Sequence, residues 1–440
     1  MRYKNYILLV LTLVLLSFIQ ASAQESKALT LQDAIQLGVQ NSKQLRLSQS
    51  RIDEAIAATK EATQARLPDA SVSGSYLRLT QPTINMKSKV GDSTGGGFVA
   101  PGINQVLYGS ANVSLPIYAG SKIKYGIESA KYLEQATRLD AENDKEEIIL
   151  NTIAAYVNLY KANVAAKLVQ ESLDQSRLSD SNFANLEKNG LLARNDMLRA
   201  QLQTSNFELA LVDAENDIRL ATVNMNIMLG LPETTKLILD SASITKPAEV
   251  KTIEEYEQLA SINRNDVQAL NYRHKSADAA IKVARGDYYP SVALTGGYVA
   301  ADIPDFLTIS NAVTLGVGVK YDIGSLWKTK AKVQQAEARG NQVKINQEIL
   351  QDNIHLAINK AYQDYFSGLK RIEVNNKAVQ QANENYRISK NKYDNSLLLM
   401  TDLLDANLQQ LRANIDLFVS KADAVLAYYT LQQAAGLLKQ

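Results

Sequence analysis

The sequence predicts a mainly α-helical fold that carries a small membrane β-barrel. It is built from a duplicated unit of two strands and long coiled-coil helices. Three observations lead to this prediction. The chain repeats itself once, each half contains two short segments of alternating apolar and polar residues, and each half continues into a long proline-free stretch. Proline and glycine end or weaken helices, so their scarcity, 8 and 21 in 440 residues, favours long uninterrupted helices.

The N-terminus has the pattern of an export signal. Arg2 and Lys4 precede the apolar run 7–19, and Ala21–Ala23 forms an A-x-A cleavage site. The run is too short to span a bilayer as a helix. Residues 1–23 are therefore predicted to be a cleaved signal peptide, with an uncleaved anchor as the alternative. We expect the mature chain to be secreted, periplasmic or an outer-membrane β-barrel.

The two halves, 24–230 and 252–440, align at nearly constant offsets, with 231–251 as the linker. Pro68 matches Pro290 at an offset of 222, and Gly230 matches Gly436 at an offset of 206. The extra residues of the first half fall around the triglycine Gly95–Gly97. A repeat of about 200 residues is far longer than the period of a solenoid. The pattern therefore indicates duplication of a whole structural unit.

Each half predicts the same order of elements. Helices at 30–67 and 252–286 each end before a proline, which favours extended backbone just before it. Strands follow, and then helical stretches that fold back at a turn. The predicted strands lie at about 70–80, 107–118, 291–300 and 313–322, and the long helical stretches lie at 121–229 and 325–436.

The strands place apolar residues on one face and polar residues on the other. In the last strand Val313, Leu315 and Val317 alternate with Thr314 and Gly316. Such strands fit a transmembrane barrel with a wet lumen, or a soluble antiparallel sheet with one solvated face. The aromatic residues at the strand ends favour the membrane, because they would form an interfacial girdle. These residues are Tyr118, Tyr288, Tyr289, Tyr321 and Trp327.

The last helix carries a coiled-coil seam. Its apolar residues step by four and three along the chain, which is the heptad pattern of helices that pair. They are Leu404, Leu408, Leu411, Ile415, Phe418, Ala422, Val425 and Tyr429. The equivalent helix of the first half keeps only Leu198, Leu202, Leu209 and Val212 of this pattern.

Four strands are too few to close a membrane barrel, and open sheet edges are not tolerated in lipid. Several copies must therefore contribute strands to one ring. Two copies would give eight strands and a filled interior, whereas three would give twelve and room for a channel. The strand count requires an oligomer and leaves both copy numbers open.

Composition excludes several other functions. The absence of cysteine rules out disulfides, thiolate zinc sites and a lipidated N-terminal cysteine, and 47 basic against 46 acidic residues argue against nucleic acid. His274 and His355 are isolated, so no metal site is expected. Enzyme and nucleotide motifs are missing, and we expect neither catalysis nor a cofactor. The alternative function is a surface coiled-coil adhesin or structural protein.

Taken together, these features resemble the TolC-like family of outer-membrane efflux proteins. The resemblance covers nearly all of the mature chain and includes the stretch Tyr393–Ala406, which matches the family's tip-to-helix motif. It implies a homotrimer with a shared 12-stranded barrel on a long periplasmic α-barrel, and places the linker in its equatorial region. It also implies an outer-membrane duct for efflux or type I secretion, gated at its periplasmic end. The expected partners are lipid, a periplasmic adaptor and an inner-membrane pump of the RND, ABC or MFS type.

The resemblance also implies a periplasmic gate. It places Asp402 and Asp405 at the constriction, Tyr393 at the gating tyrosine and Asp196 at the partner aspartate. Asp402 and Asp405 lie three apart on a helix and so share a face. A role in complementing the helix macrodipole is the alternative. Leu398 replaces the family's basic residue, so a latch must use another cation. The candidates are Lys392, Arg194 and Arg199.

The two helix turns are predicted to contact the adaptor. They carry small and apolar residues, and exposed apolar surface commonly marks an interaction site. Packing inside the trimer is the alternative. The residues concerned are Gly190, Leu191, Leu192, Ser396, Leu397 and Leu398.

Overall fold

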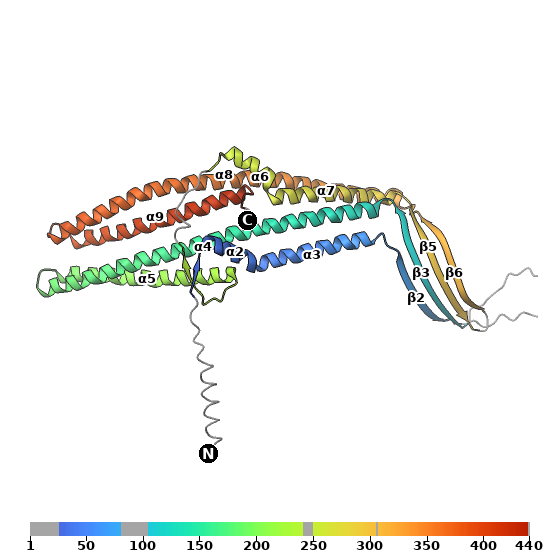
Figure 1. Ribbon diagram of the computed structural model, residues 1–440, viewed down its shortest axis with the longest axis horizontal. Coiled ribbons are helices and arrows are strands. Elements are labelled where there is room, and N and C mark those ends of the chain that lie inside the picture. The colour runs from blue at the N-terminus through green and yellow to red at the C-terminus, as the bar shows by residue number, and fades with distance from the viewer. Residues whose placement is uncertain (1–25, 81–103, 241–249, 305–306, 439–440) are drawn as a thin grey trace, which may run out of the picture. The chain divides into compact units, whose positions relative to one another are not determined.

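The computed structural model describes residues 26–80, 104–240, 250–304 and 307–438. The predicted signal peptide and the triglycine lie outside these ranges. Figure 1 shows long helices followed or preceded by strands, coloured in chain order. The elements are β1 Ser26–Leu29, α2 Leu31–Asn41, α3 Lys43–Gln64, β2 Asp69–Arg78, β3 Gln105–Ala119, α4 Lys122–Lys188, α5 Arg194–Leu229, β4 Lys236–Leu239, α6 Ile253–Asn263, α7 Asn265–Arg285, η2 Gly286–Tyr288, β5 Ser291–Ile303, β6 Leu307–Lys320, α8 Ser325–Asp394 and α9 Met400–Ala434.

The chain divides into two compact units. The sheet unit comprises Ser50–Arg138 and Gln268–Glu348, and the hairpin unit comprises the rest of the described chain. Each unit takes equivalent segments from both halves of the sequence. The predicted fold class, mainly helical with a duplicated unit of two strands and long paired helices, is confirmed. No helix within the described ranges is both long and apolar enough to cross a membrane.

The sheet unit contains one antiparallel sheet in the order β2-β3-β5-β6 (Figure 1). Its edges, β2 and β6, pair with no other described strand. The apolar row of β6 is bare, with Leu315 87% exposed, and Val72 of β2 is 86% exposed. The sheet therefore exposes both its hydrogen-bonding edges and large apolar side chains.

Two bulges interrupt the regular pairing of the sheet, and the second explains where β6 differs from its predicted range. Pro116 has no N–H to donate to the ladder, and the β3–β5 register shifts directly after it. In β6, Asn311 has φ 58° at the point where Val299 pairs with Ala312 and Ala301 with Ile309. This bulge interrupts the alternation, so the sequence pattern misses the first six residues of β6, which begins at Leu307 and not at 313.

The predicted helices 30–67 and 252–286 are each broken in two. Thr30 and Thr252 start the first pieces with capping boxes to Asp33 and Glu255. Residues at the breaks after Asn41 and Asn263 hydrogen-bond to free carbonyl groups at the C-terminal ends of the long helices. In the first half Asn41 Nδ2 donates to the Leu229 carbonyl at 2.7 Å. In the second half Arg264 Nη1 donates to the Ala434 carbonyl at 2.8 Å.

The predicted linker 231–251 contains a strand. β4 pairs in parallel with β1, and the buried Tyr156 hydroxyl lies 3.1 Å from the Leu29 carbonyl and 3.0 Å from that of Asp240. Segments of four residues carry too little alternation to be recognised, so the sequence does not predict either strand.

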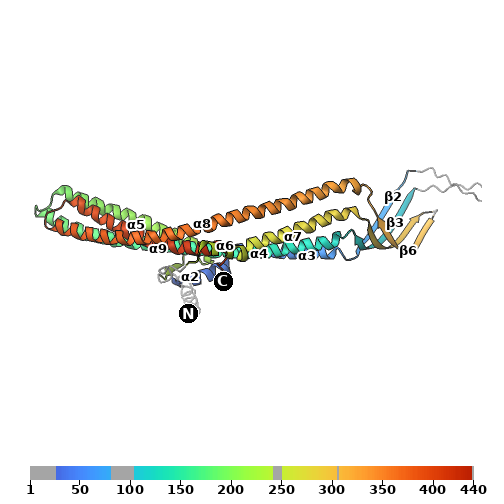
Figure 2. The same ribbon diagram turned by 90° about the horizontal axis from the view of Figure 1, so that it is seen from above.

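The hairpin unit consists mainly of the α4–α5 and α8–α9 hairpins, whose turns lie at the same end of the unit (Figures 1 and 2). The α9 seam packs on the first hairpin. Leu411 clusters with Leu173 of α4 and Phe207 of α5, and Ala422 is fully buried against a larger cluster that includes Tyr156. The predicted seam of the last helix is thus an internal packing surface.

One carboxylate holds the joint between strands and helices in the sheet unit. Asp287, in η2, accepts from Lys122 Nζ of α4 at 2.8 Å and from Lys332 Nζ of α8 at 2.7 Å. These two hydrogen-bonded ammonium groups lower the pKa of Asp287. Gly120 and Gly286 cross here so closely that a Cβ on Gly120 would meet the Gly286 carbonyl oxygen. The joint therefore ties η2 to both long helices.

Candidate functional site

The two hairpin turns have the same backbone geometry. Gly190 (φ 72°) and Ser396 (φ 62°) each take the left-handed conformation that ends a helix. In both turns the next amide, of Leu191 or Leu397, donates to the carbonyl five residues back at 2.8 Å. This is a Schellman motif at positions related by the offset of 206.

The turns divide into exposed and packed residues. Leu191 and Leu397 are each 75% exposed, and Leu399 is 71% exposed. Leu192 instead packs against a buried cluster formed by Phe183, Met197, Ala200 and Met400. Leu398 is half-buried, and Gly190 and Ser396 are exposed. Among the predicted contact residues, Leu191 and Leu397 thus form the apolar protrusions.

Tyr393 lies behind the second turn and connects the two hairpins. Its ring packs edge-on against Phe183 of α4, with centroids 5.8 Å apart. Burial raises the pKa of Tyr393, and the negative charges of Asp196 and Asp394 raise it further. Tyr393 and Asp196 therefore lie close enough for the charge of Asp196 to affect the pKa of Tyr393.

Asp402 and Asp405 line a surface cavity of about 340 Å³ between α5 and α9, together with Arg199. Asp402 and Asp196 lie in the first turns of α9 and α5, where a carboxylate also complements the helix dipole. Asp405 lies one turn deeper, where the dipole effect has faded. In the described ranges, no three His, Cys, Asp or Glu side chains are grouped as metal ligands.

The structure separates the three candidate latch cations. Arg194 is engaged across its own turn with Glu187 at 3.1 Å. Arg199 alone lines the cavity with the two aspartates, and Lys392 is exposed behind the second turn. At the offset of 206, Arg199 is the counterpart of Asp405. The two halves thus present opposite charges at equivalent positions. Aligning the two halves of the sequence is sufficient to find this relation, whereas the overall charge pattern is not.

The predicted aromatic girdle gathers where strands meet helices in the sheet unit. Tyr118 lies at the end of β3, Tyr288 and Tyr289 precede β5, Tyr321 follows β6, and Trp327 lies in the first turn of α8. Tyr289 and Trp327 are the most exposed of the five. The aromatic residues therefore border the same end of the exposed sheet.

Known proteins combine a sheet with long helical hairpins in the same way. The sequence model of the family described as "Outer membrane efflux protein" matches residues 257–437. Over this range the chain resembles the outer membrane efflux protein family. It is 24% identical to the outer membrane efflux protein BepC of Brucella suis, over 97% of this chain and 90% of BepC.

Two solved outer-membrane proteins share the fold of this chain. The outer-membrane channel OprN matches 92% of the chain with a TM-score of 0.78 and 18% identity, over 89% of its own length. The outer membrane protein VceC of Vibrio cholerae matches 92% with a TM-score of 0.75 and 19% identity, over 96% of its length. The predicted resemblance to outer-membrane efflux proteins, the outer-membrane location and the exit-duct function are confirmed.

Proposed function

We propose that three copies of this efflux protein form the outer-membrane exit duct of a tripartite system, in which a periplasmic adaptor connects the duct to an inner-membrane pump. The observation that carries the oligomer is the four-stranded sheet with two bare edges and exposed apolar side chains. Open edges are not stable in hydrocarbon, because their N–H and C=O groups find no partner there. Strands of neighbouring copies must complete the ladder.

The strand directions suit a ring of identical copies. β2, β3, β5 and β6 alternate in direction, so β2 of one copy runs antiparallel to β6 of the next when the copies are related by rotation. Three copies give twelve antiparallel strands, which leaves room for a channel.

We place the gate in the α5–α9 cavity. Arg199 faces Asp402 and Asp405 there, and symmetry would repeat this arrangement around the narrow end of the duct. A ring of carboxylates favours cations in a pore, and the interleaved arginines would hold the ring closed. Tyr393 lies next to the second turn, and its contact with Phe183 supports the packing of the two hairpins in the closed state. Asp196 lies near enough to Tyr393 to influence its pKa.

Conductance of purified protein in planar bilayers tests both duct and gate. Wild type should conduct weakly, and D402N/D405N should conduct more. R199A should also conduct more, with higher cation selectivity, because it leaves the acidic ring unbalanced. R194A is the matched control and should behave as wild type, since Arg194 pairs with Glu187. Mutants no more conductive than wild type would refute the gate, whereas a detergent-free soluble monomer would refute the duct.

We propose that the exposed leucines at the turns contact the adaptor. Leu191 and Leu397 protrude from equivalent Schellman turns and present apolar surface that no described residue covers. L191D/L397D should abolish export of pump substrates while leaving trimers intact. L192D is the comparison variant, because Leu192 packs inside the hairpin unit and its change should destabilise folding. Loss of trimers in L191D/L397D would instead support packing between copies.

A further inference from the structure

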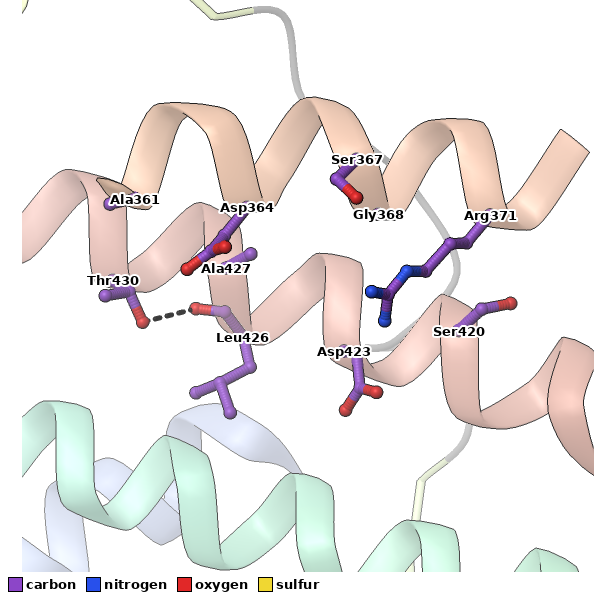
Figure 3. Close-up of a pocket in the computed structure, with 10 residues that line it drawn as sticks. All are labelled: Ala361, Asp364, Ser367, Gly368, Arg371, Ser420, Asp423, Leu426, Ala427 and Thr430. Carbon is purple, nitrogen blue, oxygen red and sulfur yellow. Dashed lines mark hydrogen bonds between the residues drawn. The ribbon is translucent and has the colours of Figure 1, made fainter. Parts of the chain in front are cut away.

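The second hairpin carries an open groove of about 290 Å³ between α8 and α9 (Figure 3). Its floor is narrow, because a Cβ on Gly368 would lie 3.3 Å from the Ala424 Cβ. Arg371 extends from α8 into the groove (Figure 3), and its guanidinium has no carboxylate partner within 4.0 Å in the described part of the chain. The groove therefore offers an unpaired cation between two helices.

The first hairpin has an equivalent face, and that face is occupied. α9 packs on α4 and α5 through Leu411 and Ala422. At its edge Lys161 of α4 donates to Asp423 of α9 at 2.8 Å. Because the halves are duplicated, the occupant of the first groove predicts the occupant of the second. The counterpart of α9 is α5, and α5 of the same chain is already part of the first hairpin.

The α5 helix has the surface that this position requires. Its seam residues Leu198, Leu202, Leu209 and Val212 are all exposed. The counterparts of the first three, Leu404, Leu408 and Ile415, pack in clusters with residues of the first hairpin. Leu220, the counterpart of Leu426, is 62% exposed. An apolar helix face of this length is left for a neighbouring molecule.

The offset of 206 also gives the register of the contact. Lys161 and Asp423 correspond to Ser367 and Asp217, so the first-hairpin ion pair cannot form again. α4 runs toward its turn and α9 runs away from its turn. The next contact toward the turns therefore lies four residues later in α4, at Ala165, and four residues earlier in α9, at Val419. Their counterparts are Arg371 and Asp213. Both are charged and of opposite sign, and Asp217 lies one helical turn away.

We propose that α5 of a second copy lies in the α8–α9 groove and that its Asp213 pairs with Arg371. The contact is head-to-tail, since each copy presents α5 on one side and the groove on the other, and such contacts close into rings. Arginine and carboxylate form strong charge-assisted hydrogen bonds when they are shielded from water. This inference rests on the ring of the proposed function and names the residues that set its register.

Charge reversal tests the pairing. R371D and D213R should each shift the trimer toward monomer by at least tenfold in dilute detergent, and R371D/D213R should restore assembly. K377D and E215R are matched controls, because these residues lie on the same helices but on other faces. Circular dichroism checks that each variant is folded. Singles without effect, or a double variant that fails to assemble although folded, would overturn the pairing.

The cysteine-free chain allows a second test. R371C/D213C should form disulfide-linked oligomers under oxidation, whereas K377C/E215C should not. Trimers without crosslinks would overturn this interface but leave the duct intact. Wild-type protein that remains monomeric in membranes would overturn the duct itself.

Discussion

Helices α5 and α9 occupy equivalent positions in the two halves and have nearly the same length, 36 and 35 residues. They nevertheless differ in what covers them. Leu408 and Ile415 of α9 pack against the first hairpin, whereas their counterparts Leu202 and Leu209 are 63% and 66% exposed. The difference indicates that duplication supplied the geometry for both contacts, and that only one of them can be satisfied within a single chain.

The same contrast recurs in the charges. The halves keep their backbone signals, since both turns are Schellman motifs and both first helices have capping boxes. They diverge where a side chain faces another helix, as in Arg199 against Asp405 or Ala165 against Arg371. Identical helices would place like charges against each other in a ring. Divergence allows opposite charges to alternate around it.

The comparison is tested most strongly by placing a charge in each seam. L202D should leave monomers folded and abolish trimers, because the α5 seam is exposed in a single chain and the proposed contact covers it with another copy. L408D should instead reduce folding of the monomer, since it buries a charge within the chain. Size-exclusion chromatography and circular dichroism distinguish the two outcomes. Equal effects of both variants on monomer folding would contradict the comparison.

The sheet offers a second test, on its two faces. L315K should destabilise the membrane-inserted form by about 2–4 kcal/mol per copy, the cost of a lysine on the lipid face near the midplane. T314K, one residue away on the other face, should cost clearly less if that face lines the lumen. Unfolding of reconstituted protein in denaturant measures both. Equal destabilisation would show that the apolar row does not face lipid.

A substitution of Asp287 tests the ion pairs at the joint between strands and helices. Only the second half has this carboxylate, because its counterpart at the offset of 222 is Ala65. D287N should lower stability at pH 7 by about 1 kcal/mol, as expected for two partly exposed ion pairs. The folded-state pKa of Asp287 is lowered, so its contribution is present above its usual pKa of 3.8 and is lost as pH falls below that value. Thermal melts of wild type and D287N should therefore converge as the pH falls through the lowered pKa of Asp287. A difference that persists below that pKa would indicate a role other than charge.

The smallest expected effect concerns the turns. Gly190 and Ser396 adopt the same left-handed conformation, which costs a residue with a Cβ about 1 kcal/mol. G190S should therefore destabilise the hairpin unit by about that amount, and S396G should stabilise it by a similar or smaller amount. Thermal denaturation compares the two. A destabilising S396G would show that the serine side chain makes a favourable contact.

Much of this fold is visible in the sequence because its signals are local. Pro68 and Pro290 mark the ends of the helices before the strands, and Gly230 and Gly436 mark the ends of the long helices. The breaks after Asn41 and Asn263 are not visible, since their cause is the end of a helix almost 190 residues away in the first case. The same holds for the cavity at Arg199, which depends on the packing of α5 against α9.

Among the three latch candidates, spacing in the sequence could not distinguish Arg194 from Arg199. Arg194 is five residues nearer to the turn, and its partner Glu187 lies on the opposite arm. Only the path of the turn decides which arginine reaches back across it. Which of these arginines belongs to the site depends on tertiary geometry and so requires the structure, although the sequence already shows that both lie near the turn.

The bare edges of the sheet also have a genetic consequence. If each copy supplies both an edge strand and the strand that seals its neighbour, one copy with a damaged β2 or β6 spoils the whole ring. With equal expression of intact and damaged chains, random mixing leaves only about one-eighth of three-membered rings free of damage. Lesions at these edges should therefore act as dominant-negative alleles, whereas null alleles should be recessive.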